Sequence, residues 1–220
     1  MIAVGNNNVQ QAYLNNKLIK CVYLGENKLY PGNLYDEEVE YIESVNADAY
    51  IDTGFRPTYK TKVVADVSDV PASAAFVYGI RDTSSGTSPR QFAFYRRTAT
   101  TIRAYYFGTN KDGSVSDTMP RATIVQDKNT TSAYGVTLTN TAVSSGICNN
   151  TLYIFALNDA GSATGLGNMK LYSCQIYDDD VLIRDYIPVR VGNEGCLYDK
   201  VEKKIYKNVG TGAFALGADK

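Results

Sequence analysis

The stretch QFAFYRRTATTIRAYYFG, Gln91–Gly108, decides the fold class. In its first part, Phe92 and Phe94 fall on one face of an extended chain and Tyr95 and Arg97 fall on the other, because successive side chains of a strand point to opposite sides of the sheet. The second part, from Thr101, alternates less cleanly but consists of similar β-forming residues. The stretch therefore predicts two paired strands. A register slip of one residue would expose the phenylalanine face to water.

Similar short runs continue on both sides of this stretch. KVVADV (62–67) alternates, and AFVYGI (75–80) is predicted to place Phe76, Tyr78 and Ile80 on one face. Clusters of turn-forming residues such as TNKDGSVS (109–116) separate the runs. No run of ten or more residues keeps a helical period. The pattern predicts an all-β protein, an antiparallel two-sheet β-sandwich of the jelly-roll type.

Two hairpins can be placed within that sandwich. IYDDDVLIRD is predicted to bend at Asp178–Asp180, and LYDKVEKKIYKN at Glu202–Lys204. Aspartate at such a bend tolerates the left-handed backbone of a tight turn.

The first 32 residues form a degenerate threefold repeat, AVGNNNVQQ, AYLNNKLIK and CVYLGENKLYP, with Asn and Gly at the breaks. We expect a β-ribbon over residues 1–33, followed by the sandwich over 34–220. A two-stranded ribbon is marginally stable in water, so it must pack on its own body, oligomerise or dock on another protein. The candidate docking or oligomerisation residues are Val9, Tyr13, Leu14, Ile19, Val22, Tyr23 and Leu24.

The composition excludes several classes of function. Lys and Arg number 22 against 23 Asp and Glu, a net charge of -1, which gives no long-range attraction to nucleic acid or an anionic membrane. No run approaches the roughly 20 apolar residues of a membrane-spanning helix, and the N-terminus lacks the pattern of a signal peptide.

The chain has no histidine, so His-based catalytic triads and zinc sites are excluded. Its four cysteines lack CxxC spacing and are expected to be free thiols.

The acidic residues do not suggest a catalytic pair. YDEEVEYIE (35–43) stands at the start of the predicted sandwich and YDDD (177–180) at a hairpin bend, so both are interpreted as solvated charge. We therefore expect no enzymatic activity and no cofactor. Asp178, Asp179 and Asp180 are weak candidates for a calcium site, since hard cations need several oxygen ligands.

A candidate ligand-binding face combines tyrosine with arginine, which supply a ring, a hydroxyl and a forked donor. Its residues are Tyr95, Arg96, Arg97, Arg103, Tyr105 and Tyr106, with Arg81 near their edge. These side chains suit a glycan or a protein surface. The alternative is an ordinary solvated sheet face with cross-strand Tyr–Arg pairs.

Four stretches occur together in one order: YIESVNADAYIDTG (41–54), LYIFALN (152–158), KLYSCQIYDDDVLIRDYIPVR (170–190) and LYDKVEKKIYKNVGTGAFALG (197–217). This set resembles a concanavalin A-like, LamG-like jelly-roll family, found in virion proteins of phages of gut anaerobes and in surface proteins of those bacteria. VYLGENKLYPG (22–32) is similar to β segments that precede such domains in phage tail and fibre proteins.

The resemblance implies a binding or structural module rather than an enzyme, and it implies structural roles for the matching residues. Gly210 and Gly212 are expected in a tight turn, Asp52–Gly54 in a turn that ends a strand, and Arg184 and Asp185 in an internal polar link.

We therefore expect a non-enzymatic phage virion structural protein, associated with the tail or a fibre, made in the host cytoplasm and oligomeric. Residues 1–33 would contact other virion proteins and the LamG-like domain would bind host surface glycan. One alternative is a capsid-decorating or head-fibre protein with no receptor role. The others are a bacterial surface glycan-binding protein and a cryptic glycan-cleaving enzyme, which would need two converging carboxylates.

Overall fold

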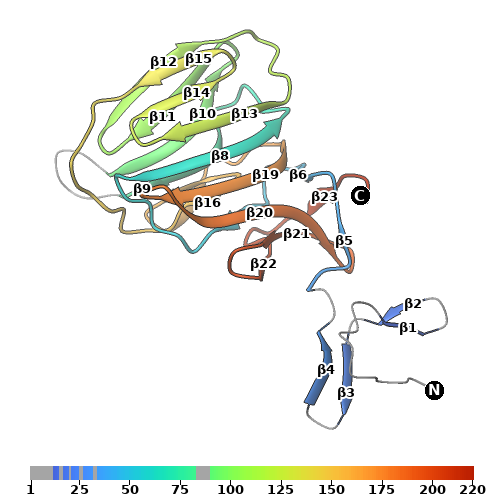
Figure 1. Ribbon diagram of the computed structural model, residues 1–220. Helices are drawn as coiled ribbons and strands as arrows, with labels where there is room; N and C mark the ends of the chain where they lie inside the picture. The colour runs from blue at the N-terminus through green and yellow to red at the C-terminus, as the bar shows by residue number, and fades with distance from the viewer. Residues whose placement is uncertain (1–11, 15–16, 20, 25–26, 32–33, 83–89) are drawn as a thin grey trace.

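The computed structural model describes residues 12–14, 17–19, 21–24, 27–31, 34–82 and 90–220. Every regular element among them is a β-strand and none is helical, so this part of the chain contains no helix that could span a membrane. The predicted all-β class is confirmed. Two sheets pack face to face (Figure 1) and form the predicted sandwich.

The first sheet, called the smaller sheet below, contains the strands that decided the fold class. Its hydrogen-bonded order is β12 (Thr109–Ser114), β11 (Thr101–Tyr106), β10 (Gln91–Thr98), β9 (Ala75–Arg81), β16 (Tyr153–Ile154) and β7 (Ile51–Asp52). The hairpin of β17 (Leu157–Asp159) and β18 (Ser162–Thr164) joins it beside β9. β17 runs parallel to β9, whereas the other pairs of this sheet are antiparallel.

The second sheet, called the larger sheet, is entirely antiparallel. Its main order is β15 (Val136–Thr139), β14 (Thr130–Ala133), β13 (Ala122–Asp127), β8 (Thr61–Ser68), β19 (Met169–Asp178), β20 (Val181–Val191), β21 (Glu194–Asp199) and β22 (Lys204–Tyr206). Three short strands complete it, β5 (Glu37–Glu38), β6 (Ile42–Ser44) and β23 (Phe214–Leu216).

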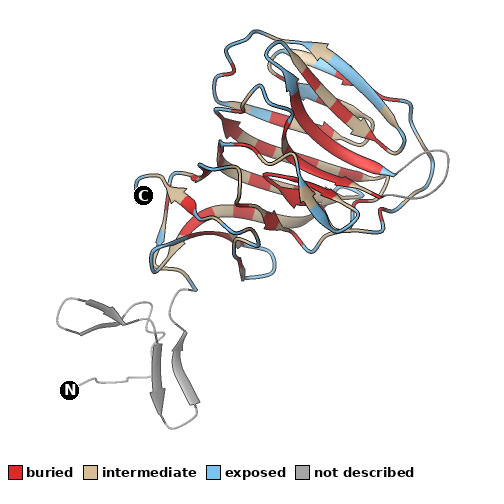
Figure 2. Ribbon diagram, turned by 180° about the vertical axis from the view of Figure 1, so that it is seen from behind, coloured by how far each residue is buried: buried red, intermediate tan, exposed pale blue. Residues whose placement is uncertain are grey.

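The core lies between the two sheets. Phe92 and Phe94 of β10 are fully buried, as predicted, and share the core with residues of the larger sheet such as Ile124. Gln126 of the larger sheet bonds the smaller sheet across the core: the Tyr78 hydroxyl donates to Gln126 Oε1 at 3.0 Å, and Gln126 Nε2 donates to the Tyr105 carbonyl at 2.8 Å. Figure 2 shows buried residues alternating with less buried ones along the strands, the pattern of a sheet with one covered face.

The prediction for β9 was wrong at one residue. Tyr78 and Ile80 are in the core, but Phe76 is partly exposed and stands opposite Tyr95 on the other face of the sheet. The register of β9 on β10 shifts between Tyr78 and Phe76, and Val77 is buried in the core. A bulge inserts one residue and so reverses the alternation beyond it.

Both predicted hairpins are present. β19 and β20 are joined by Asp179 and Asp180, with φ of 52° and 63°. Two consecutive left-handed residues are what a tight two-residue turn requires. The second bend comes earlier than expected, since Lys200–Lys203 form the turn and Lys204 already belongs to β22.

The N-terminal segment contains short strands, as the repeat predicted. β1 (Ala12–Leu14) pairs with β2 (Lys17–Ile19), and β3 (Cys21–Leu24) pairs with β4 (Asn27–Pro31). In the part of the chain that the structure describes, neither hairpin pairs with a strand of the sandwich. Val9 lies outside the described residues, and docking through this segment stays a prediction.

The segment that begins the sandwich and the C-terminal segment of the chain lie side by side. The Asp36 backbone N–H donates to the Arg190 carbonyl at 2.7 Å, and β5 pairs with β20. At the other end of the chain, the Lys220 backbone N–H donates to the Glu38 carbonyl at 2.9 Å. The body of 34–220 therefore holds its own first and last residues with backbone hydrogen bonds.

The residues with expected structural roles behave differently from one another. Gly54 lies two residues after Asp52, the last residue of β7, and has φ of 65°. Its N–H donates to Asp52 Oδ1 at 2.9 Å, so the side chain of Asp52 closes the chain reversal that ends the strand. Gly210 and Gly212 are needed because they lie close to Asp48 rather than because of a turn. A Cβ added at Gly210 would lie 2.0 Å from the Asp48 carbonyl oxygen, and one added at Gly212 would lie 1.8 Å from Asp48 Oδ1.

Cys148, Cys174 and Cys196 are free and buried, as predicted.

Candidate functional site

The predicted tyrosine–arginine residues lie mainly on the outer face of the smaller sheet. Strand alternation puts them there, because Ile102 and Ala104 of β11 are buried while the residues between and after them, Arg103 and Tyr105, are partly exposed. Arg103 stands directly opposite Tyr95 of β10. We call the group Tyr95, Arg97, Arg103, Tyr105 and Asp112 the Tyr–Arg face.

Three rings stack across three strands on this face. The Phe76 and Tyr95 ring centroids are 4.4 Å apart with an interplanar angle of 14°, and those of Tyr95 and Tyr105 are 6.0 Å apart at 13°. Tyr95 is consequently 7% exposed. Both faces of the Tyr95 ring are thus covered by its neighbours, so a ligand cannot stack on this ring.

Two arginines share a single carboxylate beside the stack. Arg97 Nη1 donates to Asp112 Oδ2 at 2.7 Å, and Arg103 Nη2 donates to the same oxygen at 2.8 Å. Hydrogen bonds from Arg103 hold the pKa of the Asp112 carboxyl below its usual value, and Asp112 raises the pKa of Arg103. The cluster therefore carries one unmatched positive charge.

The available donors are concentrated on Arg97. A guanidinium has five N–H groups, and Arg97 uses one of them within the part of the chain that the structure describes. Arg103 is more fully engaged, because its Nη1 also donates to the Tyr105 hydroxyl at 3.2 Å. Arg97 is also the more exposed of the two, at 47% of its side chain against 18%. It is therefore the residue best placed to bond a ligand.

Asp112 was missed by the sequence analysis. TNKDGSVS was interpreted as a turn cluster, but Thr109–Ser114 forms β12 and pairs along β11. In that register Asp112 stands directly opposite Arg103. The alternation of β11 was the one signal in the sequence that pointed to this residue. It predicts that Arg103 faces outward, so any strand that pairs with β11 must place one of its own residues opposite Arg103.

Arg81 lies on the same sheet but in a separate ion pair. It contacts Asp159 of β17, with Nε 3.0 Å from Oδ1. Arg81 stands opposite Gln91 in the register of β9 and β10. It therefore marks the far edge of this face and takes no part in the Asp112 cluster.

Tyr106 does not join the others. It is 2% exposed, faces the core, and its hydroxyl donates to the Tyr59 carbonyl at 2.6 Å. The reason is the period of β11, in which Tyr105 and Tyr106 must point to opposite sides.

The three aspartates proposed as weak calcium ligands diverge. Asp178 accepts hydrogen bonds from the Thr58 and Thr61 hydroxyls, Asp179 pairs with Lys60 at 2.7 Å, and Asp180 pairs with Lys128 at 3.7 Å. Over the described ranges, no three carboxylates or thiols gather in a way that could hold a metal ion.

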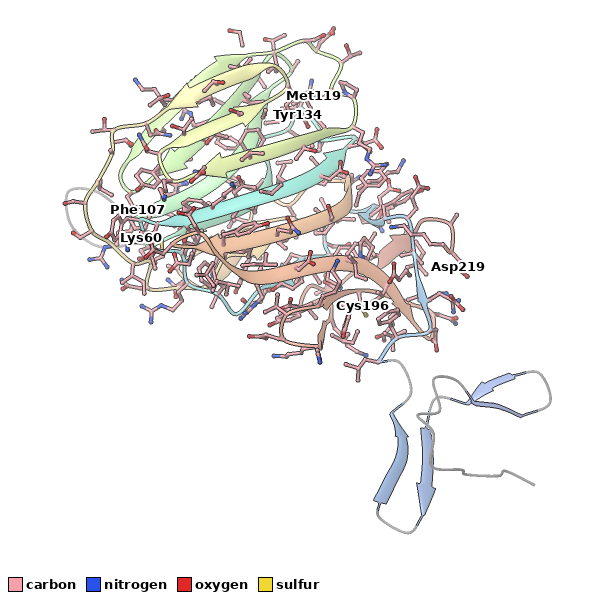
Figure 3. The ribbon with its side chains drawn as sticks, viewed as in Figure 1. Lys60, Phe107, Met119, Tyr134, Cys196 and Asp219 are labelled. Carbon is pink, nitrogen blue, oxygen red and sulfur yellow. The ribbon has the colours of Figure 1, made fainter. Side chains whose placement is uncertain are left out.

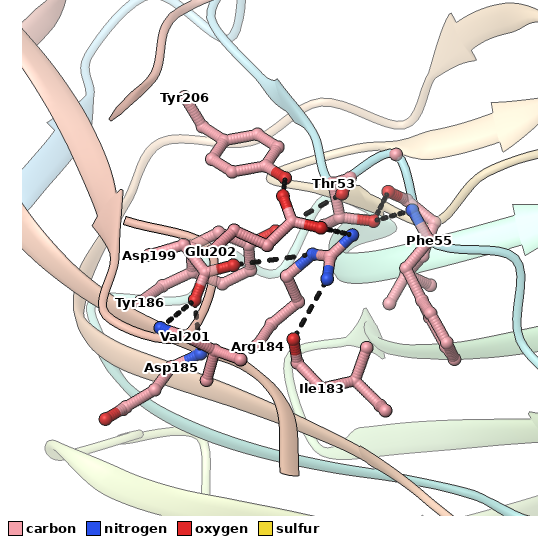
Figure 4. Close-up of polar contacts among 12 residues, drawn as sticks. Thr53, Phe55, Ile183, Arg184, Asp185, Tyr186, Asp199, Val201, Glu202 and Tyr206 are labelled. Carbon is pink, nitrogen blue, oxygen red and sulfur yellow. Dashed lines mark hydrogen bonds and ion pairs between the residues drawn. The ribbon is translucent and has the colours of Figure 1, made fainter. Parts of the chain in front are cut away.

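A buried polar network lies inside the larger sheet (Figure 4). Arg184 Nη2 pairs with Glu202 at 2.8 Å, and its Nε lies 3.5 Å from Asp199 Oδ2. Asp199 is fully buried and accepts from the Asp185 and Val201 backbone N–H groups at 2.9 and 3.0 Å. These contacts fix the turn between β21 and β22, so we interpret the network as structural.

The expected polar links of Arg184 and Asp185 therefore exist, but with different partners. Asp185 pairs with Lys200 at 2.8 Å and accepts from Gln175 at 3.1 Å. Adjacent residues of one strand face opposite sides, which explains why the two do not share a partner.

Comparison with known proteins adds no relative. No protein-family model matches the chain, and no curated protein matches it significantly.

Proposed function

We propose that this protein is a non-enzymatic structural component of a phage particle, attached through its N-terminal hairpins, whose sandwich contacts host surface glycan through the Tyr–Arg face. The observation that carries the proposal is the contrast between a self-contained sandwich and two hairpins that pair only internally among the described residues.

The attachment role is supported by the physics of short hairpins. β1 and β2 have three residues each, β3 four and β4 five. Ribbons of this size are marginal in water on their own, and their unpaired edges can accept strands from another chain. A partner protein, or further copies of this chain, would supply the missing pairing.

The binding role is supported by the composition of the Tyr–Arg face. Free guanidinium donors on Arg97 and the hydroxyls of Tyr95 and Tyr105 suit the hydroxyl-rich surface of a glycan. The absence of histidine from the sequence and the ion-paired state of Asp112 both favour binding over catalysis.

The attachment role is tested with a chain lacking residues 1–33. We expect it to fold with the melting temperature of the full chain, because the sandwich holds both of its own ends. We also expect it to lose the oligomeric state that the full chain shows in sedimentation velocity, and to be missing from assembled particles. A truncated chain that still assembles would overturn the attachment role.

The binding role is tested with a glycan array probed by the full chain. We expect binding to surface glycans of gut anaerobes that is reduced by Arg97→Ala and retained by Lys200→Ala, a change in the turn between β21 and β22. A full chain that assembles normally but binds no glycan would instead favour a capsid-decorating protein without a receptor role.

A further inference from the structure

A hollow separate from the Tyr–Arg face opens at the end of the sandwich, where the segment that follows β12 forms part of its wall. It is a wide, open hollow with a volume of about 690 Å³. Most of its wall is apolar, formed by Val70, Pro71, Met119 and Pro120. Figure 3 labels Met119 at this end of the molecule, where Tyr134 also lies.

A buried arginine forms the polar end of the hollow. Arg96 is 6% exposed, and its guanidinium donates to four backbone carbonyls, those of Thr98, Ala99, Val70 and Asp117, at distances of 2.6 to 3.3 Å. These bonds use Nε, one N–H of Nη1 and both N–H groups of Nη2. The second Nη1 N–H has no partner in the described part of the chain.

Two other charged residues of the described sandwich are buried, Asp82 and Asp199. Asp82, like Arg96, has only uncharged hydrogen-bond partners in this part of the chain, the N–H groups of Asn149 and Asn150, but Arg96 differs from Asp199. Buried Asp199 lies 3.5 Å from Arg184, whereas Arg96 has no carboxylate within 4 Å among the described residues. A buried cation without a counter-charge is costly. Carbonyl dipoles offset part of that cost, and an anion in the hollow would offset more.

Two further side chains restrict which anion fits. Thr118 lines the hollow, and its hydroxyl lies 2.9 Å from Ser116 Oγ, so it can donate to a ligand when Ser116 donates to it. Asp69 also lines the hollow and is kept ionised by Lys170 at 3.0 Å, which lowers the pKa of its carboxyl. Because the Asp69 carboxylate is negatively charged, it disfavours a ligand with several negative charges and favours a ligand whose hydroxyl group can donate to it.

We propose that this hollow binds a sugar acid. The carboxylate would accept from Arg96 Nη1 and the Thr118 hydroxyl, a ring hydroxyl would donate to Asp69, and the C–H face of the ring would rest on Pro71 and Pro120. Arg96 and Arg97 are consecutive in β10 and face opposite sides of the sheet, so this site is independent of the Tyr–Arg face.

The test measures binding to the full chain by isothermal titration calorimetry at neutral pH. The probes are D-glucuronate and N-acetylneuraminate, with D-glucose and inorganic phosphate as comparators. We expect saturable binding of at least one sugar acid with a Kd of about 1 mM or tighter, at least tenfold tighter than glucose or phosphate.

Two variants locate the site without touching Arg96. Thr118→Glu places a negative charge beside the bound carboxylate at an exposed position, so binding should fall at least tenfold while the melting temperature is kept. Thr139→Glu on β15 adds the same charge at another exposed threonine and should bind normally.

Four results would overturn the proposal. The first three are the absence of saturable binding by both sugar acids, tighter binding of phosphate than of either, and equal binding by wild type and Thr118→Glu. If the sugar acids bind but Arg97→Ala abolishes binding, the ligand belongs to the Tyr–Arg face and the hollow is not its site.

Discussion

Arg96 and Arg97 are neighbours in β10, yet their environments have little in common. Arg96 is 6% exposed and bonds four backbone carbonyls, whereas the Arg97 side chain is 47% exposed and pairs with the Asp112 carboxylate of β12, two strands away. The same contrast runs along the strand, with Phe92 and Phe94 in the core and Tyr95 in the outer ring stack. One strand thus separates a buried face that holds the fold from a partly exposed face that carries the Tyr–Arg residues.

The comparison teaches that residue type alone does not assign a role on this sheet. Tyr105 and Tyr106 are both tyrosines, but one contributes a hydroxyl edge to the outer face and the other is a core residue bonded to a carbonyl. Position within the two-residue period decides which. The predictions below test that separation of roles.

The largest effect is expected on the core side. Phe94→Ala should lower the free energy of unfolding by about 3–5 kcal/mol, because it removes a fully buried ring and leaves a cavity. Urea unfolding followed by tyrosine fluorescence measures it. A loss below about 1 kcal/mol would mean that this face is not the packed core.

Arg96→Met should cost about 2–4 kcal/mol, since four carbonyls lose a donor and some of them remain buried. Arg97→Met is the matched control on the other face and should change the free energy of unfolding by no more than about 0.5 kcal/mol. Equal costs for the two variants would contradict the division of the strand into a structural and a free side.

Asp112→Asn should reduce stability by no more than about 1 kcal/mol, because its ion pairs are partly solvent-exposed. Arg103 holds the pKa of Asp112 below its usual value, so this contribution is present above the ordinary aspartate pKa of about 3.9 and is lost as the pH falls through the lower folded value. Wild type and variant should therefore converge in stability in strong acid. Unfolding curves of wild type and variant at neutral and at acidic pH check this prediction. A difference in the free energy of unfolding that grows in acid would contradict it.

Tyr134→Phe should have the smallest effect. The Tyr134 hydroxyl is buried without a hydrogen-bond partner among the described residues, and burial raises its pKa to about 12. Removing it should leave the free energy of unfolding unchanged within about 0.5 kcal/mol or raise it slightly. A clear loss of stability would reveal a partner for this hydroxyl and would require this end of the sandwich to be redrawn.

The sequence predicted the parts of this fold that follow from local alternation. The faces of β10, the bend at Asp179 and Asp180, and the free buried thiols all follow from residue type and spacing. Phe76 was misplaced because a bulge leaves no mark in the hydrophobic pattern. β12 was missed because TNKDGS contains no β-forming run, and its strand conformation comes from pairing with β11.

The site was predictable only in part, for the same physical reason. Tyr95, Arg97, Arg103 and Tyr105 share a face that alternation could assign. The hollow around Arg96 could not be predicted, since its wall comes from segments near residues 70, 96 and 119 that only the tertiary fold brings together.

The most direct test of the account measures glycan binding and stability on one pair of samples, the full chain and its Arg97→Ala/Tyr105→Phe variant. The account predicts that affinity for the glycan selected on the array falls at least tenfold, while the free energy of unfolding changes by less than about 1 kcal/mol. Unchanged affinity, or a loss of affinity that only accompanies unfolding, would contradict the claim that the outer face of β10 is a binding surface.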